Sequence, residues 1–313
     1  MKEKNLTKKL YIIIISIIVV LLIVTVVIAN VILSSAISRK AVNGLYPYLE
    51  ILEPTQEVST TIQRFDYTNE YITSNDNLEL HGRKYTTNKS TNNWVIVIHG
   101  YGSDCNYVSD VSEIFVENGF NVLAPDLRAH GESEGKYAGM GWLDRKDILN
   151  WIDFIIEQDA DAQIILWGIS MGGATVMMTS GEDLPSNVKC AIEDCGYTSV
   201  WDEFSYQMTQ LYGYLPHFPI FNTASLMSKI RAGYSFGEAS SIKQLENCKL
   251  PMLFIHGDQD TYVPFAMLEL NYNANPRDDK ELLIVPGATH GKSHTTNPML
   301  YWSTVFTFIS NYI

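Results

Sequence analysis

Basic side chains are scarce in this sequence. Only 22 of its 313 residues are lysine or arginine, against 35 aspartates and glutamates, which gives a formal net charge of −13. Residues 1–40 hold six basic side chains and one acidic one, so the remainder of the chain carries −18. Such an acidic body disfavours binding to nucleic acid and docking on anionic lipid, because like charges repel.

Cysteine is also rare, and its positions do not form a zinc-binding cysteine motif. The chain has four cysteines, Cys105, Cys190, Cys195 and Cys248, and no pair has the spacing of zinc ligands. Cys190 and Cys195 lie close to one expected strand, where an extended chain holds them too far apart to bond. We therefore expect four buried, small, apolar side chains. Internal repeats and low-complexity tracts are absent too, as in ordinary globular proteins.

One long apolar run is present at the N-terminus. Leu10–Ala29 is almost wholly apolar, and twenty helical residues rise about 30 Å, the thickness of a bilayer's hydrocarbon core. We expect a membrane anchor at 10–33, preceded by a cytoplasmic segment at 1–9 and followed by a linker at 34–60. Four lysines precede the span, which predicts a single pass at the cell membrane with the rest of the chain outside the cytoplasm. The alternative is a signal peptide cleaved after Ser34-Ser35-Ala36, which would release a secreted protein.

Strands and helices alternate along residues 61–313. Residues 94–98, WVIVI, form a continuous apolar run that is typical of a strand covered on both faces. Residues 142–157 carry an apolar stripe at helical spacing. The other expected elements are strands at 70–73, 78–85, 120–125, 164–167, 188–192, 252–255 and 282–285, and helices at 106–118, 172–180 and 298–312. This alternation predicts an α/β fold with a doubly wound, mostly parallel sheet.

About fifty residues interrupt the alternation. The segment from about 199 to 250 has no strong strand and is rich in aromatic side chains. Because it lies between two strands of the sheet, we expect it to form a helical cap. Its apolar side chains would supply the walls of a ligand pocket.

The strongest chemical signal is Gly168-Ile169-Ser170-Met171-Gly172, which follows an expected strand and precedes an expected helix. A sharp strand-to-helix turn requires glycines on either side of the serine, because the backbones approach closely there. The turn presents the serine hydroxyl at a helix N-terminus, whose amides favour a developing negative charge. We predict that Ser170 is a nucleophile and that Gly168 and Gly172 form its turn.

A serine nucleophile needs a base, and a histidine base needs a carboxylate that fixes its tautomer. His290 follows the last expected strand and is the preferred base, with His294 in reserve. Asp260 also follows a strand and is the preferred acid, with Asp194 as the alternative; Asp258 is more plausibly a turn residue. The order serine, acid, histidine along the chain is the one expected for this fold. Structural or surface roles are expected for the remaining candidates His81, His130, His217 and His256.

Acyl transfer also needs hydrogen-bond donors for an oxyanion. We expect the backbone N–H of Met171, next to the nucleophile, and that of Tyr101, in the loop after the strand at 94–98. The sequence leaves open whether the side chain of Tyr101 lines the pocket or lies on the surface.

Five motifs agree in type and order with those of the α/β-hydrolase superfamily, which this chain resembles. The run IEDCGYTSVWDEF and the length of the cap are similar to those of bacterial membrane-anchored hydrolases described as esterases or serine peptidases. This resemblance implies hydrolysis without metal or cofactor, and structural roles for Asp126, Arg128 and Gly131. The five motifs are HGYG (99–102), DLRAHGESEG (126–135), GISMGG (168–173), HGDQDTYVP (256–264) and GATH (287–290).

The expected activity is cleavage of a small or medium acyl ester through an acyl-enzyme on Ser170. The first alternative is a serine exopeptidase, amidase or thioesterase of the same fold. An exopeptidase would bind its substrate's amine through Glu193, Asp202 or Glu203, although a surface position is the simpler expectation for these three. The second alternative is a binding protein without catalysis, against which the complete set of chemical groups argues. The expected partners are a small ester or peptide and the membrane, with no nucleic acid, and nothing in the sequence fixes the oligomeric state.

Overall fold

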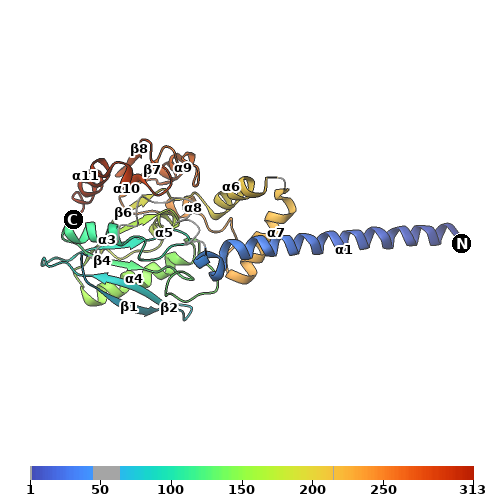
Figure 1. Cartoon of the computed structure of the whole chain (residues 1–313), viewed down its shortest axis with the longest axis horizontal. Helices are drawn as coiled ribbons and strands as arrows, with labels where there is room; N and C mark the ends of the chain where they lie inside the picture. Colours follow the sequence, from blue (N-terminus) through green and yellow to red (C-terminus); the bar gives the residue numbers. More distant parts are fainter. Residues whose placement is uncertain (1, 45–63, 214) are drawn as a thin grey trace.

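The computed structural model describes residues 2–44, 64–213 and 215–313, which contain one continuous sheet (Figure 1). Its strands are β1 (Tyr67–Thr73), β2 (Glu79–Tyr85), β3 (Asn93–Ile98), β4 (Asn121–Pro125), β5 (Gln163–Ile169), β6 (Val188–Asp194), β7 (Met252–Gly257) and β8 (Lys280–Val285). Their order is β1-β2-β4-β3-β5-β6-β7-β8. β2 is antiparallel to β1 and β4, and the remaining neighbours are parallel. The predicted, mostly parallel α/β sheet is confirmed.

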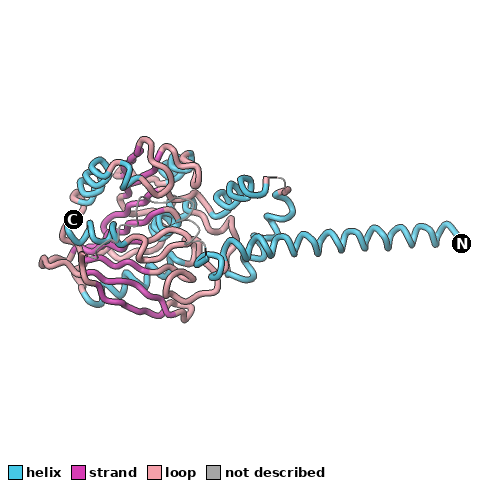
Figure 2. Tube along the Cα trace, in the orientation of Figure 1, coloured by secondary structure: helices cyan, strands magenta, loops and turns pink. Residues whose placement is uncertain are grey.

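Helices cover both faces of the sheet (Figure 2). They are α3 (Ser109–Glu117), α4 (Asp144–Gln158), α5 (Met171–Ser180), α9 (Ala266–Ala274), α10 (Ser293–Thr296) and α11 (Pro298–Ile309). Alternation along a strand explains the two layers, because successive side chains point to opposite faces. In β3, Ile96 belongs to the core that contains Trp151 of α4, whereas Val97 belongs to the core that contains Phe115 of α3. Both faces of the central strands are therefore buried, as the run WVIVI predicts.

The segment between β6 and β7 is helical. It forms α6 (Val200–Tyr212), α7 (His217–Ala232) and the short α8 (Ser241–Leu245). Ser199 caps the start of α6, where its hydroxyl oxygen accepts the N–H of Asp202 at 3.0 Å. Aromatic pairs hold the two longer helices together, and the rings of Trp201 and Phe221 lie 4.6 Å apart. These helices form a lid of apolar side chains over the edge of the sheet.

A long helix, α1 (Lys2–Ile37), projects from the end of the domain that carries the cap, far from the C-terminus (Figure 1). Residues 6–37 of this helix are long and apolar enough to cross a membrane. Most side chains up to Val31 are exposed, whereas Leu33 and Ile37 are buried in the core of the domain. The C-terminal turns of α1 pack against α7. α1 is thus in contact with the cap.

The start of the predicted linker at 34–60 differs from the structure. α1 continues to Ile37, and residues 39–44 are again helical. The N–H of Ala138 donates to the carbonyl of Ile37 at 2.8 Å, and the side chain of Val42 is buried. Residues 34–44 therefore belong to the folded domain, because they contribute apolar side chains to its core. Residues 45–60 of the predicted linker lie outside the described residues.

Candidate active site

Ser170 occupies a sharp turn between β5 and α5. Its backbone has a φ of +58°, which a residue other than glycine adopts only under constraint. A Cβ at Gly172 would lie 2.1 Å from the carbonyl oxygen of Ile98, and one at Gly168 would lie 2.3 Å from the carbonyl oxygen of Gly172. Both glycines are therefore required by close backbone contact. The turn has the shape that the sequence predicts.

The structure brings Ser170, His290 and Asp260 together. Oγ of Ser170 lies 2.8 Å from Nε2 of His290, and Nδ1 of the same ring lies 2.7 Å from Oδ2 of Asp260. Because the carboxylate takes the Nδ1–H, Nε2 carries the lone pair that faces the serine hydroxyl. The carboxylate is fully buried, and the imidazole remains partly accessible. This arrangement can remove a proton from the serine hydroxyl.

Asp260 is held by four groups. Its Oδ1 accepts the N–H of Tyr262 at 2.9 Å and that of Val263 at 3.0 Å, and its Oδ2 contacts His290 and, at 3.1 Å, Nε2 of His256. Burial by itself would raise the pKa of Asp260, but the hydrogen bonds from the two histidines outweigh burial and hold it at about 2. The carboxylate is therefore ionised throughout the neutral range.

Sequence reasoning assigned His256 a structural or surface role and missed its position behind the acid. The ring is fully buried, and its Nδ1 has no partner among the described residues. Burial disfavours its charged form, yet Asp260 and Glu193 raise the pKa of His256 overall. The spacing His256-Gly257-Asp258-Gln259-Asp260 was visible in the sequence, but nothing local showed that the chain turns the histidine back onto Asp260.

The alternative base and acids lie elsewhere. Nε2 of His294 faces Asp110 at 3.8 Å. Asp194 is buried and accepts the hydroxyl of Ser293 at 3.2 Å. Asp258 accepts a backbone N–H from the loop that precedes the histidine, which is the turn role expected for it. The backbone carbonyl of Asp194 accepts the N–H of Ser170 at 2.8 Å, but among the described residues no side chain of these three alternatives hydrogen-bonds to the serine hydroxyl.

The loop after β3 lies directly against the nucleophile. A Cβ at Gly100 would lie 3.2 Å from Cβ of Ser170, and both Tyr101 and Met171 line the same cavity as Ser170. Neither Tyr101 nor Met171 uses its backbone N–H in a hydrogen bond to another described residue. These two amides are placed where an oxyanion donor would be needed, and that role stays a prediction.

The side chain of Tyr101 lines the cavity, which settles a question that the sequence left open. Its hydroxyl donates to the backbone carbonyl of Ala36 in α1. The cavity has a volume of about 280 Å³ and is mainly apolar, with Phe204, Met208 and Phe221 among the cap residues that line it. It suits an apolar group next to the serine.

Two of the three acidic residues that were expected at the surface are buried, so this prediction was wrong for them. Glu203 lies on the inner face of α6 and lines the cavity; Oε1 accepts the side-chain N–H of Gln207 at 2.9 Å, and Oε2 has no partner among the described residues. Burial raises the pKa of Glu203 to about 8, and that of Glu193 at the end of β6 to about 8 as well. Asp202 is exposed, as expected.

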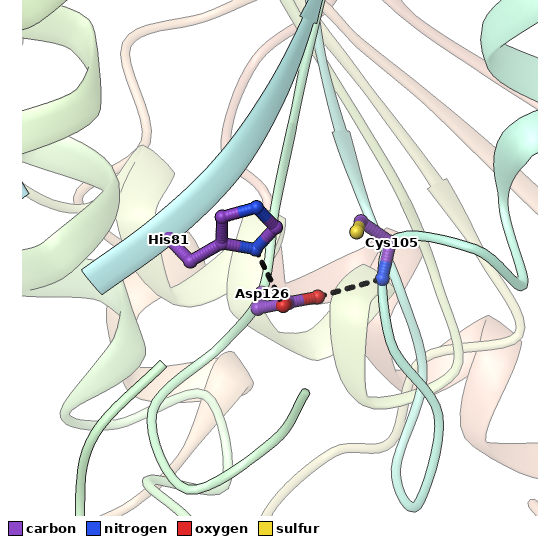
Figure 3. Close-up of side chains that lie close together, drawn as sticks. All are labelled: His81, Cys105 and Asp126. Carbon is purple, nitrogen blue, oxygen red and sulfur yellow. Dashed lines mark hydrogen bonds and ion pairs between the residues drawn. The ribbon is translucent and has the colours of Figure 1, made fainter. Parts of the chain in front are cut away.

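A second cluster joins His81, Cys105 and Asp126 (Figure 3). Nδ1 of His81 lies 2.8 Å from Oδ2 of Asp126, whose Oδ1 accepts the N–H of Cys105 at 2.8 Å. Both carboxylate oxygens are thus occupied, and burial raises the pKa of the Cys105 thiol, which keeps it protonated and a poor metal ligand. A Cβ at Gly131 would meet the same carboxylate at 2.2 Å. The cluster ties β2, β4 and the neighbouring loops together, and all four cysteines are buried and unpaired, as predicted.

Known proteins share this architecture. The family described as serine aminopeptidase, S33, matches residues 89–213, which include the nucleophile turn. The esterase Pf2001 of Pyrococcus furiosus superposes with a TM-score of 0.66 over 82% of this chain and 97% of its own, at 24% identity. The chain has the α/β-hydrolase fold.

Two proteins are related to this α/β hydrolase by sequence. YqkD of Bacillus subtilis is 27% identical over 278 residues, which are 88% of this chain and 86% of YqkD. The lysophosphatidylserine lipase ABHD12 of Mus musculus is 27% identical over 158 residues, which are 50% of this chain and 38% of the lipase. The hydrolase therefore spans most of YqkD but well under half of the lipase. Family, fold and relatives together support hydrolase activity.

Proposed function

We propose that this α/β hydrolase cleaves carboxylic acyl esters through Ser170, His290 and Asp260. The observation that carries the proposal is the continuous pair of hydrogen bonds, 2.8 Å from serine to histidine and 2.7 Å from histidine to aspartate. The ionised carboxylate of Asp260 can stabilise the imidazolium that forms when the ring takes a proton.

The reaction has two halves. Oγ of Ser170 attacks the ester carbonyl carbon while Nε2 of His290 takes its proton, and the N–H groups of Met171 and Tyr101 donate to the oxyanion. The ester C–O bond then breaks, and His290 returns the proton to the leaving alcohol. In the second half, His290 takes a proton from water while the water oxygen attacks the acyl carbon. The bond from the acyl carbon to Oγ of Ser170 then breaks, His290 gives its proton to Oγ, and the carboxylic acid leaves.

The cavity favours an acyl group over a charged amine. Its lining is mainly apolar, and a pKa of about 8 leaves Glu203 largely uncharged at pH 7. The free α-amine of a peptide is charged at this pH, and the protonated carboxyl group of Glu203 would not form an ion pair with it. The second candidate is a peptidase, which the family description favours and for which Glu203 would have to ionise on binding. Hydrolysis of an aminoacyl-naphthylamide, with no activity on aryl esters, would select that candidate.

We further propose that α1 spans the cell membrane once and leaves the catalytic domain outside the cytoplasm. The apolar side chains of α1 are exposed along most of its length, which would be unfavourable in water. Lysines near its N-terminus support a cytoplasmic position for that end. Cleavage as a signal peptide is the alternative, and the mass of the mature chain distinguishes the two.

The full-length protein in detergent micelles provides the test of ester cleavage. We expect it to hydrolyse p-nitrophenyl esters and to react with a fluorophosphonate at Ser170. Ser170→Ala should lower turnover by at least about 1,000-fold, because the nucleophile is lost. Ser186→Ala removes an exposed hydroxyl and serves as the matched control. An unchanged rate in Ser170→Ala would refute the assignment.

A further inference from the structure

The membrane helix forms part of the wall of the catalytic cavity. Ile32, Leu33, Ser35 and Ala36 of α1 line the same cavity as Ser170. Side chains of the cap helix α6, among them Phe204 and Met208, line the same cavity. The anchor therefore contributes directly to the space in which a substrate would bind.

Specific hydrogen bonds fix α1 in this position. Arg231 of α7 donates to the side-chain oxygens of Asn30 and, at 3.1 Å, Ser34. Arg39 donates to two carbonyls of the loop that follows β4, one of them that of Gly131 at 2.9 Å. The hydroxyl of Tyr101 donates to the carbonyl of Ala36, so these contacts hold the chain at several points between Asn30 and Arg39. The position of α1 in the wall of the cavity is therefore fixed by specific hydrogen bonds to the rest of the domain.

The position of the wall along α1 places the cavity at the bilayer surface. If the hydrocarbon core contains Leu10–Ala29, then Ala36 lies seven residues beyond it, which corresponds to about 10 Å of helix. The polar headgroup layer on one side of a bilayer is roughly 5–8 Å thick. Ile32, at the other end of the wall, lies three residues or about 4.5 Å beyond the hydrocarbon core, so the wall crosses the headgroup layer. Its Ile32 end is thus next to the depth at which ester groups of membrane lipids lie, between the hydrocarbon and the headgroups.

Apolar side chains are exposed on the cap helices α6 and α7. Leu211 of α6 and Ile32 of α1 both line the cavity, and the side chain of Leu211 is 66% exposed at the surface of the cap. On α7, Leu226 and Ile230 lie one turn apart and are 61% and 76% exposed. The cap is at the end of the domain from which α1 projects (Figure 1). The exposed apolar side chains of the cap therefore lie at the same end of the domain as the apolar helix α1. Such a surface suits contact with the hydrocarbon chains of a bilayer.

We propose that the substrate is a membrane-resident ester with one acyl chain, and that this chain enters the cavity from the bilayer between α1 and α6. The volume of about 280 Å³ lies near the lower end of the range for small-molecule sites, which suits one chain and leaves little room for two. α1 then sets the length of chain that fits. This inference rests on the ester hydrolysis proposed above and adds the substrate class and its route of entry.

Two substitutions in the wall and one beside it test the role of α1. Ala36→Trp fills the cavity, Ile32→Ala enlarges it, and Val31→Trp changes an exposed side chain that does not line it. The full-length variants in micelles are compared on p-nitrophenyl acetate, butyrate, octanoate and dodecanoate. Labelling with a fluorophosphonate checks that each variant keeps an assembled site.

The measured quantity is the ratio of kcat/KM for dodecanoate to that for acetate. We expect Ala36→Trp to lower this ratio by at least about tenfold, the scale of selectivity that apolar pocket contacts produce. Ile32→Ala should shift the optimum towards longer chains, and Val31→Trp should keep the wild-type ratio. If wild type cleaves the esters but neither wall variant changes the ratio, the inference is overturned while the proposed function stands. If wild type cleaves no ester, both fall.

A vesicle assay tests the substrate class. The full-length protein is reconstituted in ether-linked phosphatidylcholine, which it cannot cleave, together with either monododecanoylglycerol or didodecanoylglycerol. We expect dodecanoic acid to be released from the single-chain ester and at least about tenfold more slowly from the two-chain ester. Equal rates would overturn the single-chain assignment.

Discussion

Glu203 carries a buried carboxyl group in the wall of the cavity, and its replacement by glutamine gives a quantitative test of that burial. Glutamine has nearly the same shape but does not titrate. In the folded state, burial raises the pKa of Glu203 from 4.5 to about 8. The stability that the protonated group contributes is fully present below pH 4.5 and is lost as the pH rises towards 8.

The size of the effect follows from the shift. One pKa unit corresponds to about 1.4 kcal/mol, so between pH 5 and pH 7 this group lowers the free energy of unfolding by about 3 kcal/mol. Other buried acids, such as Asp144, titrate in both proteins and cancel in the difference. The cost of burying the glutamine amide is the same at every pH and also cancels. The difference between wild type and Glu203→Gln in the pH dependence of the free energy of unfolding therefore reports on Glu203 alone.

The assay is urea unfolding of the full-length protein in detergent, followed by tryptophan fluorescence at pH 5, 6 and 7. Wild type should lose about 3 kcal/mol more stability over this range than Glu203→Gln. Glu157→Gln changes an exposed glutamate of α4 and should behave like wild type. Parallel curves for wild type and Glu203→Gln would show that the carboxyl group is hydrated, and the argument from burial would fail.

Two further substitutions test the catalytic groups and the turn. Asp260→Asn should lower kcat for p-nitrophenyl acetate by about 10⁴-fold, the loss seen when a triad histidine no longer has its tautomer fixed; a loss below tenfold would remove Asp260 from the mechanism. Gly172→Ala should lower the Tm sharply or prevent folding, because its Cβ would lie 2.1 Å from the carbonyl oxygen of Ile98. Gly237→Ala, where a Cβ meets nothing within 4 Å, is the control, and an equal Tm for the two variants would contradict the reasoning.

The sequence predicted the convergence of Ser170, Asp260 and His290 because each follows a strand of a parallel sheet. Parallel strands end at the same edge, so residues that are 120 positions apart along the chain, such as the serine and the histidine, meet there. The motif around Ser170 carried its own backbone requirement, which the two glycines satisfy. The positions of these residues could therefore be predicted from short sequence patterns. Their catalytic role is tested by Ser170→Ala.

The burial of two glutamates and the position of His256 depend on contacts between residues that no short sequence pattern predicts. Acidic residues are usually exposed, so the burial of Glu193 and Glu203 could not be read from their neighbours in the chain. The same holds for His256, whose contact with Asp260 depends on how the loop after β7 folds back.

The sequence by itself determined the alternation of elements, the strained serine turn and the apolar length of α1, because each is encoded in the periodicity or spacing of neighbouring residues. Only the tertiary structure decided that α1 lines the cavity of Ser170. That contact joins residues almost 200 positions apart, as in the pair Ser34 and Arg231, and it depends on how α1 and the cap pack against each other. Short sequence patterns specify the apolar surfaces of α1 and of the cap, but only the packing of the folded chain brings these two surfaces into contact.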